Sequence, residues 1–184
     1  MDNGAGSYRR FLDGDDSGFI EIIRDYKDGL IFYLNGFVNN IHTAEELAED
    51  TFVKIVTKKP AYRGKSSFKT WLYAIGRNVA IDYIRRNKKA ALPVDEFRAF
   101  ISEEESLEQS YIREERKITV HKALRKLKME YQQILWLIYF EEFSNQEAAA
   151  VMKKSVHNIE SLVYRARKSL KTELEKEGFD HEGL

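Results

Sequence analysis

Proline is the residue that most constrains this chain, because only two occur in 184 residues, Pro60 and Pro93. Proline lacks a backbone N–H and clashes with the preceding helical turn, so a chain almost without it has long stretches free to be helical. Within those stretches apolar residues recur at three- and four-residue steps, which is the spacing of one helix face. No segment of the sequence shows sustained strand-like alternation. The pattern predicts an all-α protein.

The N-terminal half predicts a series of amphipathic helices. Residues 19–41 have the spacing of one long helix or of a helical pair. Thr43 lies three residues before Glu46, which is the capping-box arrangement, and we expect it to open the next helix. The inner face of that helix is expected to hold Leu47, Thr51, Phe52 and Ile55. Ser66 or Ser67 is expected to cap a third helix. One side of this third helix would carry Phe68, Trp71, Leu72, Ile75, Val79 and Tyr83.

The helical pattern stops near residue 89 and resumes near residue 111. The stretch between contains Pro93 and a run of acidic residues, which is typical of a linker. We therefore predict two small helical domains, residues 1–88 and 111–184, joined by a linker at residues 89–110.

The second domain ends in a pattern typical of a helix-turn-helix. Ser144 with Glu147 forms a second capping box and predicts a short helix that ends near Met152. After a three-residue turn, Ser155 is expected to cap a longer helix that ends near Lys176. This geometry lays the second helix in the major groove of DNA. On spacing alone, an ordinary helical hairpin with a solvated basic face remains open. The predicted inner stripe of the second helix is Val156, Ile159, Val163, Ala166 and Leu170.

Charge is unevenly distributed although the net charge is zero. Residues 1–53 hold eleven acidic and four basic side chains, whereas residues 54–89 hold eleven basic side chains and one acidic. Such alternation predicts an acidic surface and a basic surface that contact different partners.

Several function classes are disfavoured by the residues present. The chain has no cysteine, and its four histidines (His42, His121, His157 and His181) fall in no metal-ligand or catalytic spacing. There is no glycine-rich phosphate-binding loop. We therefore expect no enzyme activity, no cofactor and no metal. The sequence shows neither a signal peptide nor a membrane-spanning stretch, so we expect a cytoplasmic protein with no membrane segment of its own.

Three motifs together resemble the extracytoplasmic-function sigma factors of the sigma-70 family. TAEELAEDTF at residues 43–52 is similar to the family's polymerase-docking helix. FKTWLYAI at residues 68–75, with the basic residues that follow, is similar to its promoter-melting helix. Residues 131–167 are similar to its region four. The resemblance covers roughly residues 10–175 in the family's order. The departures from its pattern are Glu49, Lys153, Glu160 and Leu162.

The departure at Lys153 has a physical consequence. The family usually has glycine at this position in the turn. Lysine there would cost roughly 1 kcal/mol if the position needs a left-handed backbone.

The resemblance implies a docking surface and two DNA-contacting surfaces. The residues implied to bind core polymerase are Glu45, Glu46, Leu47, Glu49, Asp50 and Phe52, although such an acidic stretch is also typical of a solvated helix face. The residues implied to contact the minus-ten element are Lys65, Tyr73, Arg77, Asn78, Arg85 and Arg86. Phe68 and Trp71 fit a core role better, and Asp82 is expected to orient a neighbouring arginine. The residues implied to contact the minus-thirty-five element are His157, Asn158, Glu160, Ser161, Tyr164, Arg165, Arg167 and Lys168.

The function implied by the resemblance is that of an alternative sigma factor. Its expected partners are bacterial core RNA polymerase, promoter DNA and an anti-sigma factor. The alternative is a stand-alone helix-turn-helix regulator that binds DNA as a dimer. A symmetric dimer requires a palindromic site, whereas sigma factors contact two different elements.

Overall fold

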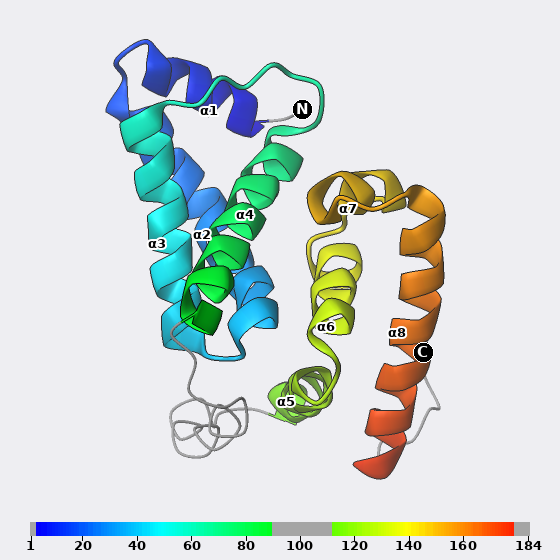
Figure 1. Cartoon of the computed structure of the whole chain (residues 1–184). Coiled ribbons are helices and arrows are strands. Elements are labelled where there is room, and N and C mark those ends of the chain that lie inside the picture. The colour runs from blue at the N-terminus through cyan, green and yellow to red at the C-terminus, as the bar shows by residue number, and fades with distance from the viewer. Residues whose placement is uncertain (1–2, 90–111, 179–184) are drawn as a thin grey trace.

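The computed structural model describes residues 3–89 and 112–178, which form two groups of helices packed side by side (Figure 1). Within these ranges there is no strand, so the all-α prediction is confirmed. The N-terminal group consists of α1 (Asn3–Leu12), α2 (Asp16–Val38), α3 (Ile41–Lys58) and α4 (Phe68–Lys89). The C-terminal group consists of α5 (Ile112–Arg125), α6 (Met129–Leu135), η2 (Trp136–Phe140), α7 (Asn145–Met152) and α8 (Val156–Lys176). Residues 90–110 of the predicted linker lie outside the described ranges.

The boundary between α2 and α3 differs from the prediction. Residues 16–38 form one helix, which ends where Asn39 adopts a left-handed backbone with φ 51°. Asn40 is the N-cap of α3, because its side-chain oxygen accepts a hydrogen bond from the Thr43 N–H at 3.0 Å. The predicted start at Thr43 is therefore wrong. The Asn40 side chain accepts the hydrogen bond from the Thr43 N–H, and Thr43 itself lies inside the first turn of α3. α1 was not predicted from the sequence at all.

The core of the N-terminal group lies between α2, α3 and α4, with α1 packed across the first turns of α2. Tyr8 of α1 is buried, and its hydroxyl donates a hydrogen bond to the Pro60 carbonyl at 2.8 Å. Ser67 caps α4 by accepting a hydrogen bond from the Thr70 N–H at 3.2 Å, which selects it over Ser66. Phe68 at the start of α4 is fully buried, as expected.

The helix-turn-helix follows the predicted boundaries closely. Ser144 and Glu147 form the reciprocal capping box of α7, and Ser155 caps α8 by accepting from the Asn158 N–H at 3.2 Å. Lys153, which follows α7, has φ 53° and ψ 49°. This is the left-handed conformation that a non-glycine residue adopts only at a free-energy cost.

The inner side of α8 differs in part from the predicted stripe. Ile159 and Ala166 are fully buried, but the third buried residue in this stretch is Leu162. Val156 is 38% exposed, so its predicted place on the inner face is wrong. It lies in the first turn, ahead of the point where α8 packs against the rest of the domain.

A π-helix, η2, follows α6 directly at Trp136–Phe140. The Glu141 N–H donates to the Trp136 carbonyl at 3.1 Å, which is a five-residue step. The sequence did not predict this, because periodicity does not show where one extra residue is accommodated in a turn.

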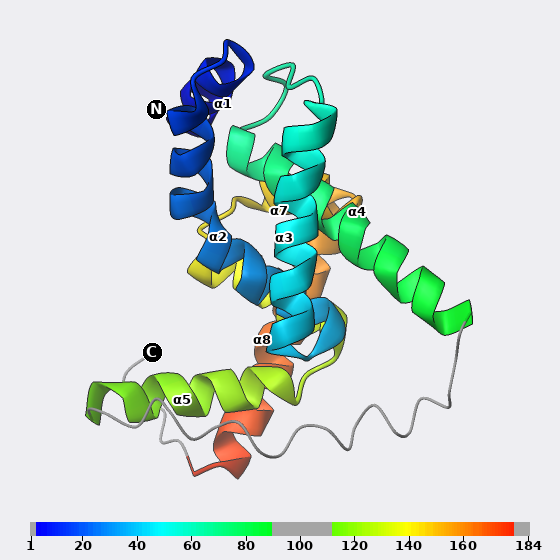
Figure 2. The same cartoon turned by 90° about the vertical axis from the view of Figure 1, so that its left-hand side faces the viewer.

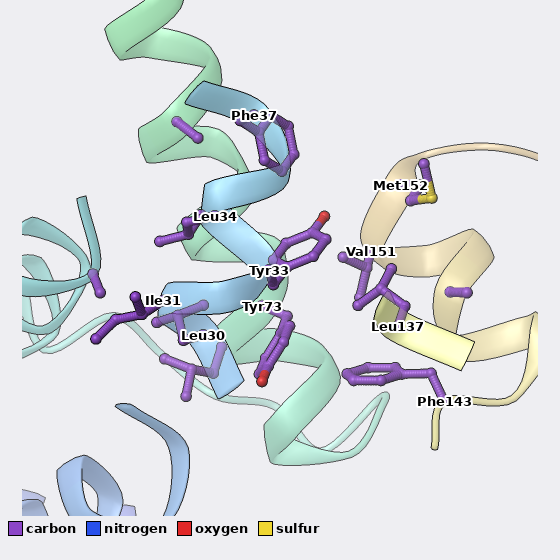
Figure 3. Close-up of a cluster of buried hydrophobic side chains, with 14 of the residues drawn as sticks. Leu30, Ile31, Tyr33, Leu34, Phe37, Tyr73, Leu137, Phe143, Val151 and Met152 are labelled. Atoms are coloured by element: carbon purple, nitrogen blue, oxygen red, sulfur yellow. The ribbon is translucent and has the colours of Figure 1, made fainter. Parts of the chain in front are cut away.

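The two groups share a continuous core. In both views α6 and α7 lie against the side of the N-terminal group formed by α2 and α4 (Figure 1 and Figure 2). Tyr33 of α2 and Tyr73 of α4 meet Leu137, Phe143 and Val151 of the C-terminal group in this core (Figure 3). No helix of the described ranges is long and apolar enough to cross a membrane.

Candidate polymerase and DNA interfaces

The outer face of α3 is acidic. Glu45, Glu46, Glu49 and Asp50 are all exposed there, as the docking hypothesis requires. These four residues lie in the N-terminal half of α3, which begins directly after its N-cap residue Asn40. A row of carboxylates in this position is suited to a basic partner surface.

The apolar residues predicted for this docking face are instead in the core. Leu47 is 2% exposed and Phe52 is 5% exposed, as part of the inner face of α3. Their assignment as polymerase-binding residues is therefore corrected, because a partner cannot reach them in this fold. Val53, which is 56% exposed, and Val56, which is 37% exposed, lie on the outer side of the same helix. Sequence reasoning missed both, although Val53 is seven residues after Glu46 and so shares its face.

The basic face predicted for minus-ten DNA lies along α4 and the loop before it. Lys65, Arg85 and Arg86 are exposed, whereas Arg77 and Asn78 are half-buried. The Asp82 carboxylate lies 3.1 Å from the Arg85 guanidinium, so the expected pairing of Asp82 with an arginine is confirmed. This contact holds one arginine head group at a defined position on the helix surface.

Tyr73 does not lie on that basic face. It is fully buried, with its ring centroid 5.4 Å from that of Tyr33 and 5.2 Å from that of Phe143 (Figure 3). Burial raises the pKa of the Tyr73 hydroxyl, and the nearby Glu141 carboxylate raises it further. The prediction that Tyr73 is available to DNA is wrong for this arrangement of the domains, because Phe143 of the C-terminal group covers the ring.

The outer face of α8 carries every residue predicted for the minus-thirty-five element. All eight side chains are exposed, and Tyr164 is the most exposed large apolar residue of the described ranges, at 71%. His157, Glu160, Ser161, Tyr164 and Arg165 line a shallow hollow on this face. The Arg165 Nε donates to the Ser161 carbonyl at 3.2 Å, which keeps the stem of this side chain close to the helix. Polar side chains that share one exposed helix face can reach base edges and phosphates together.

Comparison with known families identifies the kind of protein that carries these three faces. A family model described as Sigma-70 region 2 matches residues 22–90, and one described as Sigma-70, region 4 matches residues 117–170. RNA polymerase sigma factor YlaC of Bacillus subtilis is 32% identical over 164 residues, which cover 85% of this chain and 91% of that protein. The chain belongs to the sigma-70 family of RNA polymerase sigma factors.

Further relatives include a member of the extracytoplasmic-function group. ECF RNA polymerase sigma factor SigW of Bacillus subtilis is 25% identical over 170 residues, covering 88% of this chain and 91% of SigW. RNA polymerase sigma-H factor of Pseudomonas aeruginosa is 28% identical over 166 residues, covering 85% of this chain and 86% of that protein.

Solved structures show the same fold. The sigma factor RpoE, in complex with the anti-sigma factor NepR from Bartonella quintana, has a TM-score of 0.64 at 24% identity, and the match covers 85% of this chain and 96% of that one. CnrH, in complex with the cytosolic domain of CnrY, has a TM-score of 0.63 at 21% identity and covers 95% of this chain and 96% of that one.

The four departures from the family pattern have distinct structural positions. Glu49 and Glu160 are exposed on α3 and α8, so each changes the charge of a candidate contact face. Leu162 is 2% exposed and belongs to the core beneath α8. Lys153 occupies the left-handed position that glycine adopts without strain.

Proposed function

We propose that this chain is an alternative sigma factor that binds core bacterial RNA polymerase, directs it to particular promoters and assists strand opening. The observation that carries the proposal is the separation of three exposed faces on three helices. An acidic face lies on α3, a basic face on α4 and a polar face on α8. The chemistry of each face is suited to a different partner. The polymerase would perform the chemical steps, and this chain would not be an enzyme in its own right.

The acidic face of α3 is proposed to dock on the polymerase. Glu45, Glu46, Glu49 and Asp50 would supply charge complementarity, which guides association and sets the register. Val53 and Val56 would supply the apolar contact, because specific interfaces combine a desolvated apolar centre with a polar rim.

The basic face of α4 is proposed to hold the opened minus-ten element. Lys65, Arg77, Arg85 and Arg86 would follow the phosphate backbone of the separated strand, and Asn78 would hydrogen-bond an unpaired base. The face of α8 is proposed to bind the duplex minus-thirty-five element. Residues in its first turns would contact base edges, and Arg167 and Lys168 would contact phosphates.

Two further statements belong to the proposal. We expect an anti-sigma factor to restrain this protein, by analogy with the RpoE neighbour that was solved in complex with NepR. We also expect it to act in the cytoplasm, where the polymerase is. The alternative of a stand-alone dimeric regulator has less support, because the curated relatives described above are sigma factors.

Reconstitution with core RNA polymerase tests the proposal. The chain should programme core polymerase to start transcription at a limited set of promoters, mapped by sequencing transcript 5′ ends from fragmented genomic templates. Without polymerase it should bind the same DNA weakly, because its net charge is zero and acidic residues lie near its DNA faces. Nanomolar binding of the free chain to a palindrome, with no effect on core polymerase, would support the regulator instead.

A further inference from the structure

Helix α1 packs tightly on the rest of the N-terminal group, although it lies ahead of the region that matches a known family. The match to Sigma-70 region 2 begins at residue 22, whereas α1 ends at Leu12. A Cβ on Gly18 of α2 would collide with the Ser7 carbonyl oxygen of α1. A Cβ on Gly4 would collide with the ring of Phe68, the first residue of α4. α1 therefore contacts both α2 and the start of α4 at a distance that only glycine permits.

Tyr8 connects α1 to the α3–α4 loop, which consists of residues 59–67 and passes beside α1 (Figure 1). The Tyr8 side chain is 1% exposed, and its hydroxyl donates to the Pro60 carbonyl, fifty-two residues further along the chain, at 2.8 Å. The Tyr8 ring lies 5.6 Å from Phe68 and 5.2 Å from Trp71, measured between ring centroids. Burial raises the pKa of the Tyr8 hydroxyl, so it remains a protonated donor. Phenylalanine would fill the same space, and what the hydroxyl adds is the bond to the loop.

The α3–α4 loop has further contacts with α1 and α4. The Lys59 ammonium lies 5.0 Å from the centroid of the Phe11 ring of α1. The Tyr62 hydroxyl donates to the Ser66 carbonyl at 2.6 Å, which closes the loop on itself. The ring of Tyr62 lies 5.4 Å from that of Trp71 in α4. The base of the loop is therefore held at several points by aromatic side chains.

The tip of the same loop is exposed and basic. Arg63 and Lys65 are both exposed, and Gly64 between them turns the chain with a φ of 67°. Lys65 belongs to the proposed minus-ten face. A cation that is already held in place loses less conformational entropy on binding DNA than one on a free loop. The position of the loop therefore bears directly on how well Lys65 can contact a strand.

We propose that Tyr8 is a positioning residue for promoter opening: its bond to the Pro60 carbonyl fixes the α3–α4 loop so that Lys65 meets the separated strand in an ordered position. Tyr8 contacts no DNA and acts through the loop. The role of Lys65 at the DNA rests on the proposed function. The attachment of the loop to α1 rests on the contacts described above.

Two single substitutions in α1 test the attachment in the free chain. Tyr8→Phe removes only the hydroxyl and leaves the half-buried Pro60 carbonyl without its donor. Ser7→Ala is the matched control, because it removes the hydrogen bond from the Ser7 hydroxyl to the Glu21 carboxylate of α2 at 2.7 Å and leaves the loop alone. Glu21 keeps its ion pair with Arg10 in this control.

Trypsin measures how often the loop opens, because Arg63 and Lys65 at its tip are cleavage sites. Cleavage after these two residues, identified by mass spectrometry, should be about two- to tenfold faster in Tyr8→Phe, the factor that corresponds to the net contribution of one hydrogen bond. Both variants should keep their helical circular dichroism, and Ser7→Ala should be cleaved at the rate of the unaltered chain. An unchanged rate in Tyr8→Phe, or the same increase in Ser7→Ala, would overturn the attachment.

The effect on opening is measured with core polymerase on a promoter found by reconstitution. At saturating protein, the rate at which thymines become reactive to permanganate should fall about two- to tenfold in Tyr8→Phe. The concentration for half-maximal polymerase binding should not change. A purely structural role would instead lower the amount of active protein, so that excess protein restores the full rate, and that result would overturn the proposal.

A double-mutant cycle with Lys65→Ala shows whether Tyr8 acts through Lys65. Lys65→Ala should itself slow opening, and adding Tyr8→Phe should then cause no further loss, because the loop no longer carries the side chain that it positions. Losses that multiply would overturn the positioning role. If Lys65→Ala opens the promoter normally while trypsin still cleaves Tyr8→Phe faster, the attachment stands and the proposed function of Lys65 fails.

Discussion

The Lys153 ammonium donates a hydrogen bond to the Asn78 side-chain oxygen across 3.1 Å, while the Lys153 backbone is held in the left-handed region. The left-handed region is unfavourable for any residue with a Cβ. Glycine would remove that strain, but it would also remove the only side chain of the turn that hydrogen-bonds to α4 within the described residues. The two effects have opposite signs, and two substitutions separate them.

Lys153→Gly should be more stable than Lys153→Ala by about 1 kcal/mol, because both variants lose the contact with Asn78 and only glycine relieves the backbone. The free energy of unfolding is measured by urea titration followed by circular dichroism. The difference between the unaltered chain and Lys153→Ala then reports the side-chain contact. Equal stability of the two variants would show that the left-handed backbone at this position carries no cost.

On α3, Val53→Asp should fold normally and lose affinity for core polymerase, whereas Leu47→Asp should fail to fold. Val53 is 56% exposed, so a carboxylate at this position stays in water and leaves the fold intact. In the complex it would interrupt the proposed apolar contact with core polymerase and weaken binding by roughly tenfold. Leu47 is 2% exposed, and even truncation of a buried leucine costs about 2–5 kcal/mol. Circular dichroism is measured beside a polymerase pull-down. A well-folded Leu47→Asp protein that fails to bind would restore Leu47 to the docking face.

The two α3 substitutions also show what the sequence could and could not predict. Periodicity placed Leu47 and Phe52 on the inner face, family resemblance placed them on the docking face, and the structure agrees with the periodicity. Local signals such as the Ser144–Glu147 capping box were predictable because the interacting atoms lie within one turn. The burial of Tyr73 was not, since it depends on Phe143, which is seventy residues further along the chain. The outward face of α8 was predictable, whereas its exact buried stripe was not.

Arg77→Ala and Asn78→Ala should spare polymerase binding and closed-complex formation but reduce strand opening. Their proposed contacts form only with unpaired bases or the separated backbone, so the loss appears after duplex binding. Permanganate reactivity of thymines in the minus-ten region measures the defect, and a promoter with a premelted bubble should partly restore transcription. Unchanged thymine reactivity would contradict these roles.

Stability should depend on pH through Glu147. The Ser144 backbone N–H donates to its carboxylate at 3.0 Å, and together with the hydroxyls around it this contact holds the pKa of Glu147 below its ordinary value of 4.5. A pKa lowered by folding means that the stabilisation is fully present above pH 4.5 and is lost as the pH falls through the lowered value. Glu147→Gln should cost roughly 1 kcal/mol at neutral pH. The gap to the unaltered chain should close as the pH falls below 4.5 and through the lowered pKa of Glu147. Parallel stability curves would contradict this.

The face of α8 should divide into residues that read bases and residues that anchor phosphates. The N-terminal part of a helix in the major groove lies nearest the bases, so His157, Asn158, Glu160 and Ser161 are the candidates for reading. Lys168 lies two to three turns later, where it would reach the backbone. Lys168→Ala should therefore weaken all promoters alike and reduce the salt dependence by about one unit of log–log slope.

Glu160 is the residue that decides whether this division is correct. Its carboxylate is exposed and lines the same shallow hollow as Arg165, and phosphates repel it unless it accepts a hydrogen bond from a base such as the cytosine amino group. If it reads a base, Glu160→Ala should change the preference at one promoter position by about 1–3 kcal/mol. If it does not, removal of its charge should raise affinity evenly across sequences. The test is transcription of a minus-thirty-five library by core polymerase with the unaltered chain, Glu160→Ala or Lys168→Ala. If Glu160 contacts a base, the effect of Glu160→Ala depends on the promoter sequence, whereas the effect of Lys168→Ala is the same for all sequences.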